Sequence, residues 1–187
     1  YRSKLHLGLD DKQFDGTQIH GIALVGQMVR RGRPLTLGYS ARIEADTMVW
    51  GYSADLVMNT PGGSGNELAA YQSEDPRITT TQWVALRGGA NYTTVWGGGW
   101  LWGVRGQFQY SANPLISGEQ FGLGGSASVR GTGERPIAGD SGALVSMEVT
   151  APELLPGLRL LGFVDAGWLG NNATAGTPKL SRDGLSS

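Results

Sequence analysis

The segment Gly139-Asp140-Ser141-Gly142 holds the residues of a possible nucleophilic serine site. His20 and either Asp46 or Asp55 precede Ser141 in the order base, orienting acid, nucleophile, which is one of the known triad orders. Ala143 follows where such a site needs a second glycine beside its oxyanion hole. We keep a soluble β-barrel serine hydrolase as an alternative of another class. The competing interpretation is that Asp140 caps a turn just before a strand.

Other chemistry finds little support in the composition. The chain has no cysteine and only two histidines, so thiolate sites and His-based metal clusters are not expected. The glycine pattern of residues 122–127 resembles a dinucleotide-binding turn, but no helical periodicity follows it. The net charge of −1 gives no basic surface for nucleic acid. We therefore expect no cofactor, no metal, no nucleic-acid partner and no enzymatic activity.

Residues 100–110 alternate between two unlike faces, which predicts a strand. One face carries Trp100, Trp102, Val104, Phe108 and Tyr110, and the other carries Arg105, Gln107 and Gln109. This length suits a strand that spans an outer membrane, which needs about 9–11 tilted residues. Aromatic residues near both ends of the apolar face fit the two interfacial girdles of such a strand.

Similar patterns predict an all-β chain with about nine strands in one domain, residues 1–187. The expected strands are 4–10, 17–29, 34–45, 47–59, 79–95, 100–110, 143–150, 158–169 and 178–187. The glycine-rich and charged segment 124–142 lies between two of them and lacks the alternating pattern of a strand. The chain opens and stops within expected strands, so we expect further strands outside it.

Residues 107–167 resemble the C-terminal barrel of two-partner secretion transporters, the haemolysin-activator family of Gram-negative outer membranes. The motifs that carry this resemblance are Gln107, the segment 114–121, Gly124-Gly125, Ser128-Val129-Arg130-Gly131, Gly139-Asp140, the strand around Glu148, and Phe163-Val164-Asp165-Ala166-Gly167. The family motif continues with Phe or Tyr after Gly131, where this chain has Thr132.

The resemblance implies a partial antiparallel transmembrane β-barrel of the outer membrane, cut from about sixteen strands. It also implies POTRA domains and final strands outside this chain. A loop at about residues 119–141 would fold back into the barrel lumen, and its Arg130 would pair with Asp165 on the inner wall, beside a second carboxylate, Glu148. A bidentate pair in a water-accessible lumen would contribute roughly 1.5–3 kcal/mol.

The resemblance further implies the function. The expected protein secretes a large exoprotein of haemolysin or adhesin type, and the lumen loop acts as its gate. The expected partners are that exoprotein, outer-membrane lipid and lipopolysaccharide, and the expected location is the outer membrane of a Gram-negative bacterium. Assembly or insertion of other outer-membrane proteins is the alternative within the same superfamily.

Overall fold

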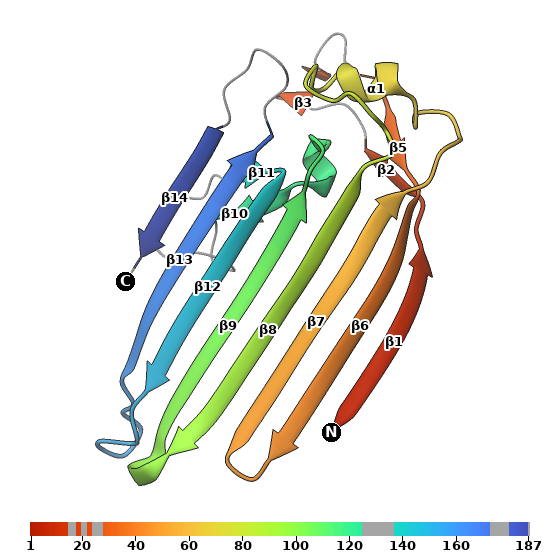
Figure 1. The fold of residues 1–187 in the computed structure, drawn as a ribbon. Coiled ribbons are helices and arrows are strands. Elements are labelled where there is room, and N and C mark those ends of the chain that lie inside the picture. Colours follow the sequence, from red (N-terminus) through yellow and green to blue (C-terminus); the bar gives the residue numbers. More distant parts are fainter. Residues whose placement is uncertain (15–17, 20–21, 24–27, 125–136, 173–179, 187) are drawn as a thin grey trace.

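One antiparallel sheet dominates the computed structural model, which describes all residues except 15–17, 20–21, 24–27, 125–136, 173–179 and 187 (Figure 1). The sheet has eight strands in the order β1-β6-β7-β8-β9-β12-β13-β14. Their bounds are β1 (Arg2–Leu9), β6 (Pro34–Ala45), β7 (Met48–Asn59), β8 (Val84–Trp96), β9 (Trp100–Ser111), β12 (Ser141–Thr150), β13 (Leu161–Asn171) and β14 (Leu180–Ser186). Each strand pairs with its neighbour along the chain once the short elements are left aside, so the sheet is a meander.

The remaining elements are short and lie in the connections. They are β2 (Lys12–Phe14), β3 (Gln18–Ile19), β4 (Ile22–Ala23), β5 (Arg30–Gly32), α1 (Leu68–Gln72), η1 (Gly97–Gly99), η2 (Ser117–Glu119), β10 (Phe121–Leu123) and β11 (Ile137–Gly139). β2 pairs with β5, β3 with β4, and β10 with β11. No helix in the described part of the chain is long and apolar enough to cross a membrane.

The all-β fold class is confirmed, but the strand expected over residues 17–29 is wrong. β1 pairs directly with β6 from Arg2 opposite Arg42 to Leu9 opposite Leu35. The described residues of the intervening segment instead form the short β3 and β4, which pair with each other and not with the large sheet. The described sheet therefore has eight strands where the sequence predicts about nine.

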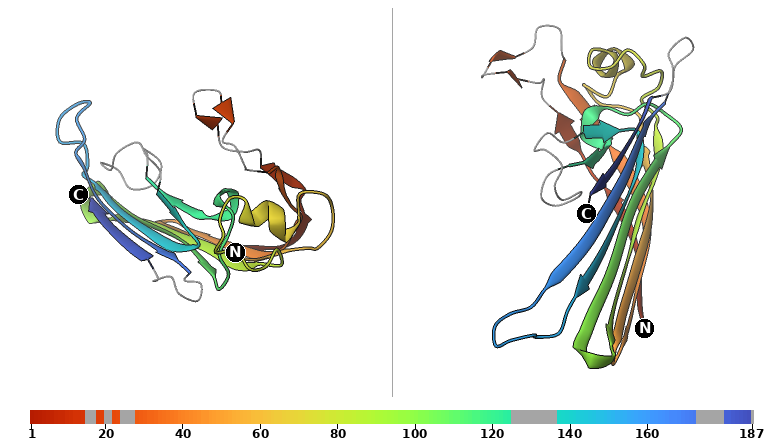
Figure 2. Two further views of the ribbon diagram at one scale, coloured as in Figure 1. Left: turned by 90° about the horizontal axis from the view of Figure 1, so that it is seen from above. Right: turned by 90° about the vertical axis from the view of Figure 1, so that its left-hand side faces the viewer.

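The two faces of the sheet differ as the alternation in 100–110 predicts. One face exposes large apolar side chains on every strand from β1 to β13; on β1, Leu5 and Leu7 are each 73% exposed. Leu37, Trp50, Leu56, Val84, Leu86, Trp100, Phe108, Tyr110, Val145, Met147, Val164 and Trp168 are further exposed members. The sheet is curved, and β10 and β11 lie on its concave side (Figure 2). We call the concave side the inner face and the apolar side the outer face.

The inner face carries polar side chains in rows that cross the strands. One row runs from His6 through Gly38, Asp55 and Arg87 to Gln109. Gly38 is required in this row, because a Cβ there would lie 2.1 Å from the Asp55 carboxylate and 2.1 Å from the His6 ring. His6 and Asp55 instead meet across the glycine, with 3.1 Å between Nε2 and Oδ1.

The two ends of the sheet have different connections. Two residues join β6 to β7, and η1 alone joins β8 to β9. The opposite end carries the long connections 10–33, 60–83 and 112–140. All three connections contribute to one apolar cluster with residues of β7 and β8, formed by Val57, Tyr71, Ile78, Trp83, Ala85, Leu115 and Ile116 with Phe14 against it.

Candidate functional site

The connection between β9 and β12, residues 112–140, leaves the sheet and returns to it on the inner side; we call it the β9–β12 loop. Its described parts are η2 and the paired β10 and β11. Phe121 and Leu123 of β10 pack on Leu144 of β12 and Leu169 of β13. The described part of the loop therefore rests on the inner face of the wall, as β10 and β11 show in Figures 1 and 2.

The outgoing stem of this loop is fixed by Glu119, whose side chain is buried. Arg87 Nη2 donates to Glu119 Oε2 over 2.8 Å, and Lys12 Nζ lies 3.1 Å from Oε1. Arg87 also donates from Nε to Gln109 Oε1 over 2.7 Å, and Gln109 Nε2 donates to the Glu119 carbonyl over 2.9 Å. Glu119 thus joins the loop to β8 and β2 through its carboxylate, and to β9 through its main-chain carbonyl, which accepts from Gln109.

The register of the sheet explains why Arg87 and Gln109 act together. These residues are direct partners across β8 and β9, and both point to the inner face. Side chains directly opposite one another on one face lie within contact distance. A guanidinium and an amide are thereby placed side by side, where the fork of the arginine reaches both Gln109 and the carboxylate of Glu119.

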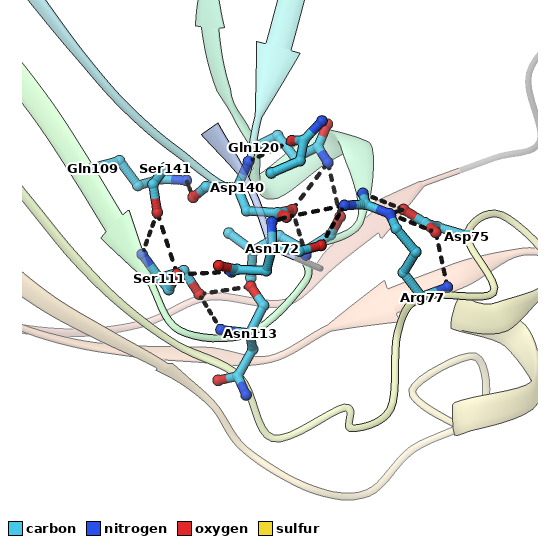
Figure 3. A network of polar contacts seen from close by, with 11 residues as sticks. Asp75, Arg77, Gln109, Ser111, Asn113, Gln120, Asp140, Ser141 and Asn172 are labelled. Carbon is cyan, nitrogen blue, oxygen red and sulfur yellow. Dashed lines mark hydrogen bonds and ion pairs between the residues drawn. The ribbon is translucent and has the colours of Figure 1, made fainter. Parts of the chain in front are cut away.

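The returning stem is fixed by Asp140, which is fully buried just before β12 (Figure 3). Its Oδ1 accepts hydrogen bonds from the Leu115 amide (2.9 Å) and Gln120 Nε2 (3.2 Å). Its Oδ2 accepts one from the Asn172 amide (2.8 Å) and contacts Arg77 Nη1 at 3.4 Å. A buried carboxylate needs such compensation. Asp140 therefore ties its own loop to the loop between β13 and β14 and to the one between β7 and β8.

Arg77 is itself held in place before it reaches Asp140. Asp75 accepts from Arg77 Nε at 3.0 Å and from Nη2 at 2.5 Å, and Arg77 Nη1 donates to the Asn172 carbonyl at 3.0 Å (Figure 3). The hydrogen bonds to Asp75 raise the pKa of Arg77 further above its ordinary value, with a smaller contribution from Asp140. The guanidinium is a permanent cation at this junction.

A third contact joins the loops at the same end of the sheet. Glu74 accepts a hydrogen bond from the Ser117 amide over 2.5 Å, and Arg30 Nε lies 2.6 Å from Glu74 Oε2. The β1–β6, β7–β8 and β9–β12 connections are therefore linked through buried or half-buried carboxylates. We call the contacts of Glu119, Asp140 and Glu74 the loop clamp.

The geometry around Ser141 differs from that of a catalytic serine. Ser141 begins β12, and its Oγ is nearly buried between the Ser111 amide (3.0 Å) and the Ser111 carbonyl (3.2 Å). Asp46 lies in the β6–β7 turn at the other end of the sheet, and Asp55 pairs with His6. His20 lies outside the described residues. The described groups at Ser141 fix the start of a strand.

The residues expected to anchor the lumen loop are placed as follows. Asp165 is fully buried on the inner face and accepts a hydrogen bond from Ser146 Oγ over 2.6 Å. Glu148 lies in the neighbouring inner row, directly opposite Phe163, and Gly167 lies opposite Leu144. Arg130, Val129, Gly131 and Gly125 lie outside the described residues, so their expected roles remain predictions.

The structure explains why glycine is needed at two of the expected loop positions, Gly124 and Gly139. Gly124 has φ 119°, in the left-handed region that favours glycine. A Cβ at Gly139 would lie 3.0 Å from the Gly170 carbonyl, so a side chain there would push the returning stem away from β13. Gly124 follows β10 directly, and Gly139 is the last residue of β11.

The family model of the haemolysin secretion/activation proteins ShlB/FhaC/HecB matches residues 30–186. The chain belongs to this family. The match covers β5 to β14 and therefore includes the β9–β12 loop and both of its stems. The recognition of the haemolysin-activator family from the motifs in 107–167 is thus confirmed. No curated protein matches the chain.

Two solved structures of other proteins have the same fold as this ShlB/FhaC/HecB family member. CdiB from Escherichia coli matches with a TM-score of 0.73 at 19% identity, over 99% of this chain and 35% of that one. CdiB from Acinetobacter baumannii matches with a TM-score of 0.60 at 23% identity, over 84% of this chain and 27% of that one. The chain therefore spans about a third of these structures or less.

Sequence reasoning named Asp140 but missed its partners and missed Glu119 as a clamp. Glu119 was visible only as part of the segment 114–121. Arg87 offered a signal, since an arginine at an inner-face position of a strand is a candidate to meet a carboxylate. Nothing in the sequence indicates that this carboxylate is Glu119, because Arg87 and Glu119 are 32 residues apart.

Proposed function

We propose that this chain forms part of the wall of an outer-membrane β-barrel that secretes a large exoprotein by two-partner secretion. One observation carries the proposal: the two faces of the sheet differ. The inner face is polar and holds a loop whose stems are buried, and the outer face exposes apolar side chains. An outer face of this kind is stable against lipid, and a polar inner face suits a water-filled lumen. The family membership supports the same activity.

The proposed domain is one partial barrel, residues 1–187, with the lumen loop at about 119–141. POTRA domains and further strands would lie elsewhere in the full protein. In bacterial outer-membrane barrels the long loops face the cell exterior and the short turns face the periplasm. The loop clamp then lies at the external mouth, and the turns at β6–β7 and β8–β9 lie at the periplasmic side.

The proposed mechanism is a gate rather than an enzyme. The loop clamp fixes both stems of the β9–β12 loop, so that only the segment between the stems has to move when the exoprotein passes. Arg130 in that segment would reach across the lumen to Asp165, with Glu148 nearby. Hydrogen bonds to charged groups in such a setting contribute roughly 1.5–3 kcal/mol each, which holds one loop position while still permitting its release.

The proposed partners follow from this arrangement. They are an exoprotein of haemolysin or adhesin type inside the lumen, and lipid with lipopolysaccharide on the outer face. A nucleic-acid partner is not proposed, because the chain carries a net charge of −1.

Secretion by the full-length protein tests the proposal. Arg130→Ala should leave the barrel in the outer membrane but impair release of the exoprotein encoded with it, and Arg130→Lys should restore release only in part because lysine lacks the bidentate fork. Arg159→Gln in the exposed β12–β13 hairpin removes an equal charge outside the lumen loop and serves as the matched control. Wild-type release by Arg130→Ala would remove the anchor from the mechanism, and a full-length protein recovered outside the membrane would remove the transporter itself.

A further inference from the structure

The inner face holds a second group of charged residues, far from the loop clamp. A trough of about 540 Å³ lies over β1, β6, β7, β8 and β9, toward the end with the short turns. Its charged lining consists of Arg2, Lys4, Arg42 and Arg105, and none of the described residues that line it is acidic.

Two rows of the register build this trough. The first row runs from Arg2 opposite Arg42, through Gly51 and Asn91, to Arg105. The second row runs through Lys4, Ser40, Ser53, Gly89 and Gln107. Small residues thus form the floor in the middle, and cationic side chains stand on both sides of it.

The charges of the trough are poorly compensated by the wall itself. Arg2 and Arg42 are direct cross-strand partners, and like charges placed so are destabilising. Arg42 donates to Glu44 over 2.6 Å, outside the lining of the trough. Lys4 and Arg105 form no hydrogen bond or ion pair with any residue that the structure describes. A bound anion would relieve the repulsion and give Lys4 and Arg105 a partner that the described part of the wall does not supply.

The floor of the trough adds hydrogen-bonding groups and room. Ser40, Ser53, Asn91 and Gln107 present hydroxyl and amide groups between the cations. Gly51 and Gly89 lack side chains that would fill the space; a Cβ at Gly51 would lie 2.7 Å from Asn91 Oδ1. An extended peptide can therefore lie against the wall here with its side chains among the cations.

We propose that this trough is a binding site for carboxylate-rich segments of the polypeptide that the barrel secretes. The inference rests on the proposed function and adds that the wall binds acidic segments of the secreted polypeptide. The charge complementarity of Arg2, Lys4 and Arg105 selects acidic segments over basic ones, since a ring of one sign of charge in a pore favours the opposite ion. The site holds the chain on the periplasmic half of the lumen, before it reaches the β9–β12 loop.

Pore currents of the full-length protein in planar lipid bilayers test this site, with hexaglutamate and hexalysine as the probes. Hexaglutamate should block the current with longer dwell times than hexalysine. Lys4→Gln and Arg105→Gln should each shorten the hexaglutamate dwell time about two- to fivefold, the effect of losing one solvent-accessible charge pair. Arg105→Lys should retain the dwell time, and so should the control Arg159→Gln. The differences should shrink between about 0.1 M and about 1 M salt, because the screening length falls to about 3 Å.

A wild-type measurement keeps the test independent of the variants. The reversal potential in a potassium chloride gradient should show preference for chloride. A preference for potassium, equal dwell times for the two peptides, or unchanged dwell times in both glutamine variants would overturn the site while leaving the transporter in place. The absence of any pore in the wild-type protein would overturn the proposed function and the site with it.

Discussion

Arg87 of β8 and Glu119 of the β9–β12 loop lie 2.8 Å apart, with the carboxylate buried beneath the loop and the guanidinium also held by Gln109. This pair joins the wall of the sheet to the loop that rests on it. Lys12 approaches the same carboxylate from the β1–β6 connection. The position of the outgoing stem therefore depends on one acidic residue with two cationic neighbours.

Replacing Glu119 by glutamine should release this stem. The amide keeps the shape but leaves Arg87 and Lys12 without their counter-charge, which should cost roughly 1.5–3 kcal/mol of stem anchoring. Limited proteolysis of the full-length protein in detergent should then cut the β9–β12 loop faster. Glu67→Gln, an exposed acid before α1, is the control and should leave the cleavage rate unchanged. Equal cleavage of both variants would show that the carboxylate does not hold the stem.

Replacing Asp140 by asparagine should weaken the returning stem. One carboxylate oxygen becomes an amide group that faces the Asn172 amide and Arg77, both of which are donors, so hydrogen bonds worth roughly 1.5–3 kcal/mol are lost. The melting temperature of the full-length protein in micelles should fall. Asp46→Asn, in the exposed turn at the opposite end, should leave it unchanged, and a fall of the same size there would contradict the assignment.

An arginine on the outer face should be far more costly than one on the inner face. Val145→Arg should destabilise the folded protein in lipid by roughly 2–4 kcal/mol if it lies near the bilayer midplane. Gln107→Arg on the neighbouring strand, at nearly the same height, should cost less than Val145→Arg, because its side chain points to the lumen and meets only the repulsion of the other cations of the trough. Folding yields into lipid vesicles over a urea series would measure both. Equal yields would mean that the outer face does not meet lipid.

Alkaline pH should loosen the packing around Tyr71. Burial raises the pKa of Tyr71 to about 12, against an ordinary value near 10. The unfolded chain loses this proton first as the pH rises, so the stabilising contribution is complete below about pH 10 and is lost between about pH 10 and about pH 12, at roughly 1.4 kcal/mol per unit. Denaturant unfolding across this range would show the slope.

Tyr71→Phe is the matched variant for that measurement. It should remove the part of the slope that Tyr71 contributes, while lowering stability at neutral pH because the Arg31 carbonyl loses its 2.8 Å hydrogen bond from the phenol. The neutral-pH loss should be roughly 1–3 kcal/mol. An identical alkaline slope in Tyr71→Phe would assign the transition to another group.

Local patterns in the sequence were sufficient for the strands whose two faces differ. The alternation from Trp100 to Tyr110 gave β9 almost to the residue, and the segment 34–45 coincides with β6. The segment 17–29 was wrongly predicted as a strand of the sheet: its apolar residues resemble one, but its described residues form the short paired strands β3 and β4 outside the large sheet. The pattern of a single segment does not show whether it joins the main sheet or pairs within its own connection.

The sequence by itself determined the all-β class, the two unlike faces of the strands, the family, and the position of the loop that interrupts them. These are properties of neighbouring residues, since side chains in a strand alternate with a period of two. Only the tertiary structure decided which charges meet: that Glu119 meets Arg87 and Lys12, that Asp140 meets Arg77, and that four cations share one trough. Such contacts depend on strand register and on how the loops fold back, because they join residues that lie far apart along the chain.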